Sequence, residues 1–372
     1  MSLALVSHPD YNSGSRPPGS HPLPHATRAR PVAGRPVGAR RERNAMVITV
    51  PDTRASEGLR PIDMARDVPQ IVELLKLVFG EALEFDEGQL LGDDVSASIS
   101  TLFYRLNPAT SRLANGFVWV AEGRIVGNVT LLSTKAWDRY LVANVAVHPT
   151  YRRRGIARAM MQAVTSHVRT RGGRAILLQV VKDNFSAIDL YDSFGYVRVG
   201  DMTTWYSAAS RLRRLEPADN GRAIDIRPLP GNRWRDAYAL DTVCVPADLN
   251  WPEPLRADAY RQTLWQRLGD MMNSRALETW VTTGAGERLT GLMSLSSQWG
   301  RSHWVVLRVH PDYAGQLERP LLAKAIRRLQ QLPRRNVRID HPDNDTVANT
   351  LLAEANFATQ RTLTHMRLDL SR

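Results

Sequence analysis

Residues 144–157 of this chain, NVAVHPTYRRRGIA, join the end of an apolar run to a turn and to the start of a helix. From Leu141 to Val147 the residues are apolar and rich in valine, which predicts a buried strand, and Pro149 bars its continuation as a central strand. From Ile156 onward apolar residues recur at helical spacing. The turn is therefore expected at a helix N-terminus, an arrangement that suits phosphate.

Backbone N–H groups in the first turn of a helix have no intrahelical partner, so they bind an anion without a dedicated side chain. Gly155 removes the Cβ that would block a close approach, and Ala157 is small. The pattern Arg152-x-x-Gly155-x-Ala157 therefore suits a diphosphate, with Arg153 and Arg154 adding attraction. Taken alone, the glycine turn is equally explained as a plain corner between a strand and a helix.

Two further segments follow the turn. Residues 174–181, RAILLQVV, predict a second buried strand. Residues 184–196, NFSAIDLYDSFGY, predict a short helix capped at Asn184 and ended at Gly195, and an edge strand is expected from there through Trp205. Residues 144–196 as a block resemble the GNAT acyltransferase superfamily, whose acetyl-coenzyme A (acetyl-CoA) site combines an Arg/Gln-x-x-Gly-x-Gly/Ala turn with a later Asn-to-Tyr helix.

The resemblance implies a cofactor site at the turn. The pyrophosphate of acetyl-CoA would rest on the amides of residues 153–157, and the pantetheine arm would lie where two parallel strands splay apart, as a peptide adds to a sheet edge. The cofactor-binding residues expected on this basis are Val145, Ala146, Val147, Arg152, Arg153, Arg154, Gly155, Ile156, Ala157 and Asn184.

The resemblance also implies catalytic roles. Tyr191 lies where the family often keeps a tyrosine that protonates the departing thiolate, and a phenol with a pKa of about 10 carries its proton at neutral pH. The alternative for Tyr191 is a helix tyrosine packed on the sheet. Some family members place a glutamate base on the strand corresponding to 174–181, where this chain has Gln179. An amide is not a base, so either an acid elsewhere acts through water or a neutral fraction of the amine suffices.

An acidic patch, Glu81, Glu84, Asp86 and Glu87, lies between two expected helices at 68–79 and about 90–106. In the family such a connection flanks the acceptor cleft. A solvated loop is the interpretation that we favour for it.

The motif around the turn occurs twice, because Val147-His-Pro-Thr-Tyr151 returns as Val309-His-Pro-Asp-Tyr313. Leu59-Arg-Pro61 returns as Ile226-Arg-Pro228, and the apolar hairpin at 117–132 has a counterpart at 280–295. We therefore expect an α+β protein of two tandem GNAT-like domains, each a mixed, largely antiparallel sheet flanked by helices. The expected parts are a disordered basic Pro/Gly/Arg-rich tail (1–57), a catalytic first repeat (58–210), a linker (211–223) and a second repeat (224–372).

The second repeat departs from the family pattern at the turn. Leu317 replaces the glycine, and Glu318 places a carboxylate near the helix start, where it would compete with phosphate. Leu352 stands in the place of the tyrosine. These changes predict a degenerate copy that kept the fold and lost the cofactor, although Gly315 leaves a shifted turn open.

Composition narrows the function classes. The 372 residues carry a net charge of +12, but no aromatics are interleaved with the basic residues and no nucleic-acid motif occurs, so a nucleic-acid partner is not favoured. Cys244 is the single cysteine and predicts a buried thiol at a helix end, and the nine histidines lack metal-binding spacing, so we expect no metal. No apolar run has the length of a membrane helix, which predicts a cytoplasmic protein, monomeric or homodimeric.

The function expected from these observations is transfer of an acetyl group from acetyl-CoA to a primary amine of a small molecule or protein, in a ternary complex. The alternative is a non-catalytic acyl-CoA-binding sensor or scaffold, which the missing strand glutamate permits. The acceptor itself cannot be inferred from these residues.

Overall fold

The computed structural model describes residues 57–90, 114–136, 138–216, 224–251, 254–263, 272 and 275–370. Residues 53–372 belong to one compact unit. The expected tail up to residue 56, most of the expected helix at 90–106 and the linker from 217 to 223 lie outside the described residues.

The first repeat alternates strands and helices as its hydrophobic periods predict. The predicted strand before the turn is β4, the helix after it is α3, and the strand at 174–181 is β5, so these three predictions are confirmed. The elements are β1 (Gly58–Pro61), α1 (Val68–Leu90), β2 (Ala114–Ala121), β3 (Arg124–Ser133), β4 (Arg139–Val147), η1 (Pro149–Tyr151), α3 (Ile156–Thr170), β5 (Ala175–Val181), α4 (Phe185–Asp192), β6 (Val197–Ala208) and η2 (Ala209–Arg211).

The second repeat presents its strands and helices in a corresponding order, and the shared His-Pro motif ends β4 in one repeat and β10 in the other. Its elements are β7 (Arg227–Pro228), α5 (Trp234–Cys244), η3 (Ala247–Leu249), β8 (Arg275–Thr283), η4 (Ala285–Glu287), β9 (Leu289–Gln298), β10 (His303–Val309), η5 (Pro311–Tyr313), α7 (Glu318–Leu329), β11 (Asn336–Pro342), α8 (Thr346–Glu354) and β12 (Ala358–Asp369).

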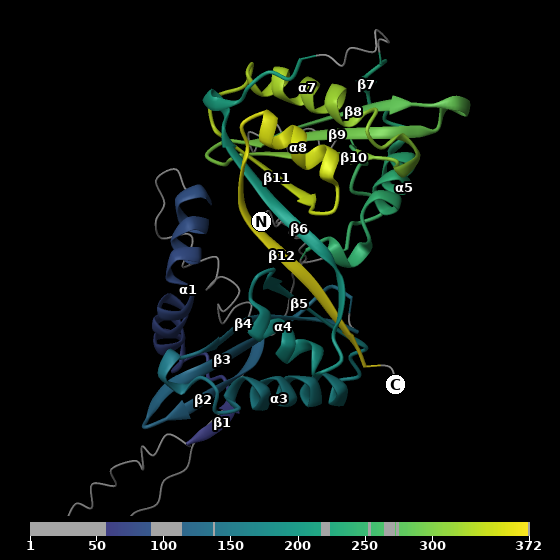
Figure 1. Cartoon of the computed structure of the whole chain (residues 1–372). Coiled ribbons are helices and arrows are strands. Elements are labelled where there is room, and N and C mark those ends of the chain that lie inside the picture. Colours follow the sequence, from purple (N-terminus) through teal and green to yellow (C-terminus); the bar gives the residue numbers. More distant parts are fainter. Residues whose placement is uncertain are drawn as a thin grey trace, which may run out of the picture. The chain divides into compact units, whose positions relative to one another are not determined.

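The twelve strands of the described residues form one sheet, in the order β1-β2-β3-β4-β5-β12-β6-β11-β10-β9-β8-β7. Neighbours pair antiparallel except β4 with β5 and β10 with β11, which are parallel. Helices pack on the sheet in both repeats (Figure 1). The expected α+β class, with a mixed and largely antiparallel sheet, is therefore confirmed.

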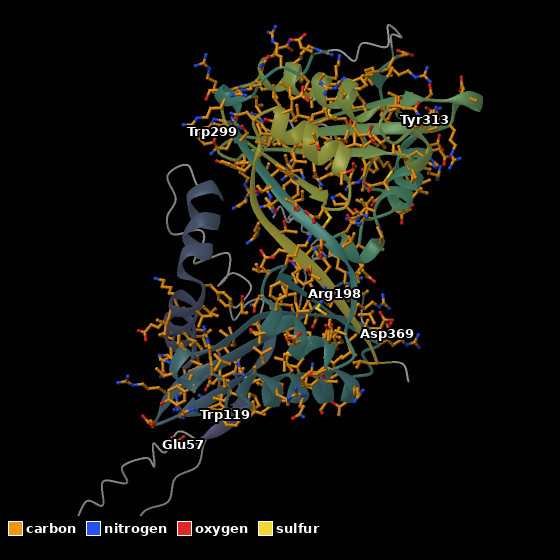
Figure 2. The ribbon with its side chains drawn as sticks, in the orientation of Figure 1. Glu57, Trp119, Arg198, Trp299, Tyr313 and Asp369 are labelled. Atoms are coloured by element: carbon orange, nitrogen blue, oxygen red, sulfur yellow. The ribbon has the colours of Figure 1, made fainter. Side chains whose placement is uncertain are left out.

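The two repeats exchange their last strands. β6 of the first repeat lies between β12 and β11, and β12 of the second repeat lies between β5 and β6 (Figure 1). Arg198 near the start of β6 and Asp369 at the end of β12 mark this antiparallel pair (Figure 2). The predicted strand through Trp205 is confirmed as β6, but its predicted place at the edge was wrong, because both of its neighbours come from sequence more than a hundred residues away.

A second correction concerns α1, which continues through the acidic patch to Leu90. The expected loop between two helices is absent there, so Glu81, Glu84, Asp86 and Glu87 lie within a helix. Gly80 and Gly88 lie on either side of this patch, and isolated glycines are tolerated in a helix.

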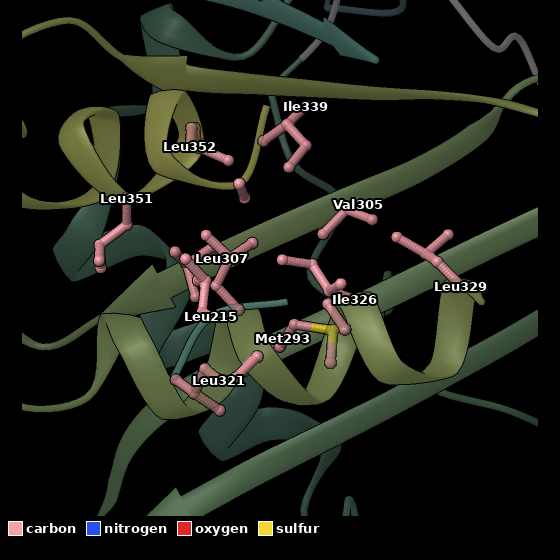
Figure 3. Packing of buried hydrophobic residues seen from close by; sticks show 14 of the residues in the cluster. Leu215, Met293, Val305, Leu307, Leu321, Ile326, Leu329, Ile339, Leu351 and Leu352 are labelled. Atoms are coloured by element: carbon pink, nitrogen blue, oxygen red, sulfur yellow. The ribbon is translucent and has the colours of Figure 1, made fainter. Parts of the chain in front are cut away.

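Hydrophobic clusters cover both faces of the sheet. On one face of the first repeat, α3 and α4 pack against side chains such as Val142, Leu178 and Met366. In the second repeat α7 and α8 pack on β10 and β11, and Leu215, from the segment expected as a linker, joins that core (Figure 3). No helix among the described residues is both long and apolar enough to cross a membrane.

The strand exchange predicts that the first repeat needs the last strand of the chain. A chain that ends after Phe357 lacks β12, which leaves β5 and β6 without their shared neighbour, so we expect it to lose the cooperative thermal unfolding of the whole chain. Circular dichroism against temperature measures this, with a chain that begins at Thr53 as the control. Unchanged cooperativity without β12 would contradict the expectation.

Candidate functional site

The loop between β4 and α3 ends on a glycine in the left-handed conformation. Gly155 is the N-cap of α3, with φ 78° and ψ 0°. A side chain in this conformation costs about 1 kcal/mol or more, which favours glycine. A Cβ at Gly155 would meet no heavy atom within 4 Å, so the backbone conformation requires the glycine and the space beside it is open.

The first turn of α3 leaves its backbone N–H groups free for a ligand. Gly155 offers no side chain that could accept from them, and the first turn contains no acidic residue. The amides of Ile156 and Ala157 therefore present the positive end of the helix dipole. An anion of the size of a phosphate group fits this position.

Two of the three predicted arginines donate hydrogen bonds to backbone carbonyls of the loop and of the strand end before it. Arg152 donates from Nε to the carbonyl oxygen of Val147 at 3.2 Å, and Arg154 donates from Nη2 to that of Thr150 at 3.1 Å. Arg153 has the left-handed φ of 64°, and no described residue pairs with its guanidinium. The arginines thus shape the loop while they add positive charge beside the helix N-terminus.

β4 and β5 part immediately before this loop. Their parallel pairing begins at Arg139 and ends where Val142 lies opposite Leu178. Residues 143–147 of β4 pair with β3 but no longer with β5. Their backbone groups on the β5 side are therefore available to an extended ligand, as the resemblance predicted.

A bulge at Asn144 accompanies the split. Asn144 has φ 55°, and the register of β3 against β4 shifts next to it. Asparagine is among the few residues that tolerate this conformation, so a lone asparagine in an apolar run was the signal that sequence reasoning missed. Of the predicted residues that follow, Ala146 is buried against the α1 side, whereas Val145 and Val147 pack toward the α3 side.

Asn184 and Tyr191 lie at the two ends of α4. Asn184 caps the helix, because its Oδ1 accepts from the amide of Ala187 at 3.3 Å. Tyr191 is 5% exposed, and burial raises the pKa of its phenol to about 12. The ring of Tyr196 lies 5.8 Å from that of Tyr191, and the hydroxyl of Tyr196 is buried without a partner among the described residues. Tyr191 therefore keeps its proton at any ordinary assay pH.

Gln179 occupies the place on β5 where the resemblance suggested a base. Its Nε2 lies 2.9 Å from Nε2 of His365, which is on β12 of the second repeat. The strand exchange brings these two residues together, and no local pattern in the sequence predicts the pair. His365 was not among the site residues predicted from the sequence.

The corresponding turn of the second repeat is already occupied by a carboxylate. Glu318 is 1% exposed, and its two oxygens accept from the amides of Gly315 at 2.9 Å and Leu317 at 3.2 Å. Gly315 is in the left-handed conformation, as Gly155 is. The side chain thus takes the amides that an external anion would need.

The second repeat also differs on the opposite face of its sheet. Arg308 stands two residues before the His-Pro motif, where the first repeat has Ala146, and its buried Nε donates to Asp241 Oδ1 at 2.7 Å. Tyr260 donates to the other oxygen of Asp241. Cys244 ends α5 as predicted, half-buried, and burial raises the pKa of its thiol to about 11, which argues against a nucleophile.

A family model described as Acetyltransferase (GNAT) family matches residues 88–196, which span the hairpin, the turn and α4. The residues that resemble this family therefore lie in the first repeat. In the part of the chain that the structure describes, no three His, Cys, Asp or Glu side chains are grouped as metal ligands.

Relatives of the chain include two named acetyltransferases. Over 85 residues the chain is 36% identical to the [Ribosomal protein bS18]-alanine N-acetyltransferase of Escherichia coli (strain K12), covering 23% of this chain and 51% of that protein. Over 105 residues it is 31% identical to N-acetyltransferase family 8 member 2 of Rattus norvegicus, covering 27% and 46%. The chain thus spans about half the length of these relatives.

The crystal structure of a GCN5-related N-acetyltransferase from Sphaerobacter thermophilus is similar in fold. Its TM-score is 0.54 at 17% identity, over 84% of this chain and 95% of that chain. The similarity in fold therefore extends beyond residues 88–196 into the second repeat.

The glycine turn predicts the effect of a carboxylate at the helix N-terminus. We expect Gly155→Glu to weaken acetyl-CoA binding by at least about tenfold, because the new charge repels phosphate where the amides should bind it. Gly172→Glu is the matched control, since Gly172 has φ 73° and equally open surroundings at the other end of α3. Isothermal titration calorimetry measures both variants, and equal affinities would argue against the assignment of the turn.

Proposed function

We propose that the protein is an N-acetyltransferase that moves an acetyl group from acetyl-CoA to a primary amine. The proposal rests on two features that follow one another along the chain. β4 separates from β5 after Val142, and the loop after β4 leads to the N-terminus of α3, where Gly155 provides no side-chain cap. The first suits an extended arm and the second suits a diphosphate. Acetyl-CoA carries both groups in sequence.

We infer the following roles for the predicted residues. The amides of residues 153–157 bind the pyrophosphate, the three arginines add charge, residues 145–147 pair with the pantetheine arm and Asn184 contacts the same arm. The acceptor nitrogen attacks the thioester carbonyl, and the C–S bond breaks. Tyr191 gives its proton to the leaving sulfur, and the proton lost by the amine restores the phenol.

We infer one cofactor site per chain. Glu318 takes the amides of the second turn, and Leu352 is buried in the core where the first repeat has Tyr191. We therefore assign catalysis to residues 58–210 and a supporting role to residues 224–372. The acceptor named for the bacterial relative, a ribosomal protein alanine, is consistent with an amine but does not identify this chain's acceptor.

A non-catalytic acyl-CoA-binding protein is the second candidate, and one observation favours it. Gln179 stands where the resemblance suggested a base, and its amide, which is hydrogen-bonded to His365, cannot take a proton from the amine. Release of free CoA with a panel of primary amines, followed with a thiol reagent, separates the two. Turnover supports the transferase, and binding without turnover supports the sensor.

The number of sites per chain is a direct test of the proposal. We expect calorimetric titration of the full chain with acetyl-CoA to give a stoichiometry of one, because the carboxylate of Glu318 excludes phosphate from the second turn. Two sites would contradict the assignment of the second repeat, and no binding would overturn the proposed function.

The role of Tyr191 predicts a loss of rate without a loss of cofactor affinity. We expect Tyr191→Phe to lower kcat by about a hundredfold, the scale of a lost general acid, with the acetyl-CoA dissociation constant unchanged. Tyr196→Phe is the control, since it removes a neighbouring buried hydroxyl that has no partner among the described residues. If both variants keep the wild-type rate, Tyr191 is a packing residue.

A further inference from the structure

A row of polar side chains crosses the sheet at the point where β4 and β5 part. Thr130 on β3 lies opposite Ala143 on β4, Gln179 is the first residue of β5 beyond the split, and His365 of β12 is its cross-strand partner. The row lies on the face where Leu177 and Trp251 pack, opposite the α3 and α4 layer. The second repeat supplies one member of this row.

The hydrogen bonds of His365 fix which of its nitrogens carries the proton. Nδ1 lies 3.1 Å from the backbone oxygen of Asp248, and a carbonyl can only accept, so Nδ1 is the protonated nitrogen. Nε2 of the neutral ring is then an acceptor, and the group 2.9 Å away is the amide nitrogen of Gln179. Gln179 therefore donates to His365, and its Oε1 keeps both lone pairs for another partner.

The second repeat holds His365 in this state. Arg139 and Arg367 both donate to the carboxylate of Asp248, which anchors η3 against the sheet. His365 is 2% exposed, and burial lowers the pKa of its imidazole below the usual value. The charged groups that face it are Asp201 from β6, Asp340 from β11 and Arg139 from β4, together with Asp248 and Arg367.

A second unused carbonyl oxygen lies across the split. Asn128 is fully buried on β3 and donates from Nδ2 to the backbone oxygen of Asn144 at 2.8 Å, which leaves its Oδ1 without a partner among the described residues. The matching position of the second repeat, opposite Arg308, is Leu292. The polar group is therefore particular to the first repeat, and a buried oxygen without a protein partner has its lone pairs free for a donor from outside the chain.

We propose that Gln179 Oε1 and Asn128 Oδ1 bind the N–H groups of the acceptor amine, and that His365 of the second repeat is the positioning residue that orients the Gln179 amide. This inference rests on the proposed function. Two carbonyl oxygens accept hydrogen bonds and donate none, so the pair favours a group that can donate two hydrogen bonds, as a primary amine can and a hydroxyl cannot. The second repeat thereby acts on the reaction of the first without a cofactor of its own.

The test compares His365→Leu with His365→Gln. Leucine removes the acceptor that orients Gln179, so we expect the KM for the amine to rise about tenfold, with the acetyl-CoA dissociation constant unchanged. Glutamine can accept from Gln179 through its own carbonyl, so we expect it to restore KM to within about threefold of wild type. Gln179→Leu is expected to raise the same KM. Because Gln179 is half-buried, this variant tests the proposal even if a substitution of the fully buried His365 destabilises the fold.

A pH profile separates orientation from simple packing. An imidazolium would donate from Nε2 and force the Gln179 amide to turn its NH₂ toward the amine, so the wild-type kcat/KM should fall as pH drops through the lowered pKa of His365. Protonation of the amine substrate lowers kcat/KM equally in the wild type and in His365→Gln. The ratio of the two pH profiles therefore isolates the effect of His365. His303→Leu is the matched control, because His303 is another fully buried histidine on β10 whose loss should leave the amine KM unchanged.

Each outcome has a distinct meaning. If the wild type neither binds acetyl-CoA nor releases CoA, the proposed function and this inference fall together. If the wild type turns over but His365→Leu and Gln179→Leu keep the wild-type amine KM, only this inference is overturned. Equal losses in the leucine and glutamine variants of His365, with acetyl-CoA affinity reduced as well, would assign His365 to packing alone.

Discussion

Strand β12 closes the open side of β5, and this pairing is the constraint on which the rest of the molecule depends. From Leu363 opposite Val181 to Asp369 opposite Ala175, the last strand of the chain supplies the hydrogen-bond partners of a strand that carries the candidate site. β6 is in turn held between β12 and β11. Because an unpaired edge exposes a row of backbone donors and acceptors, neither repeat completes its sheet alone. The two repeats therefore share one structure.

The same pairing explains how a parallel pair of strands can part in the middle of a sheet. β5 keeps β12 along one side while it loses β4 beyond Leu178, so the split leaves just one side of the strand open. The bulge at Asn144 turns β4 away, and the loop then delivers Gly155 to the N-terminus of α3. An extended ligand with a diphosphate at one end matches this order of features.

The two repeats place different side chains at corresponding positions of the fold. At the turn, an open glycine N-cap in the first repeat corresponds to a helix whose amides bind the Glu318 carboxylate in the second. On the opposite face, the buried Arg308–Asp241 pair stands where the first repeat has Ala146. A buried ion pair of this kind fills space and satisfies its own charges. The second repeat keeps the architecture, and its site residues bind one another.

The sequence by itself determined the elements of the turn and the repeated His-Pro motif, because these depend on local periodicity, on glycine and on short motifs. It also predicted the carboxylate of Glu318 at the second turn. Only the tertiary structure decided that α1 is continuous, that β6 is central and that His365 meets Gln179. The physical reason is that strands pair through backbone hydrogen bonds between distant segments. The side-chain pattern of a strand indicates which of its faces is buried, but it does not indicate which other strand lies beside it.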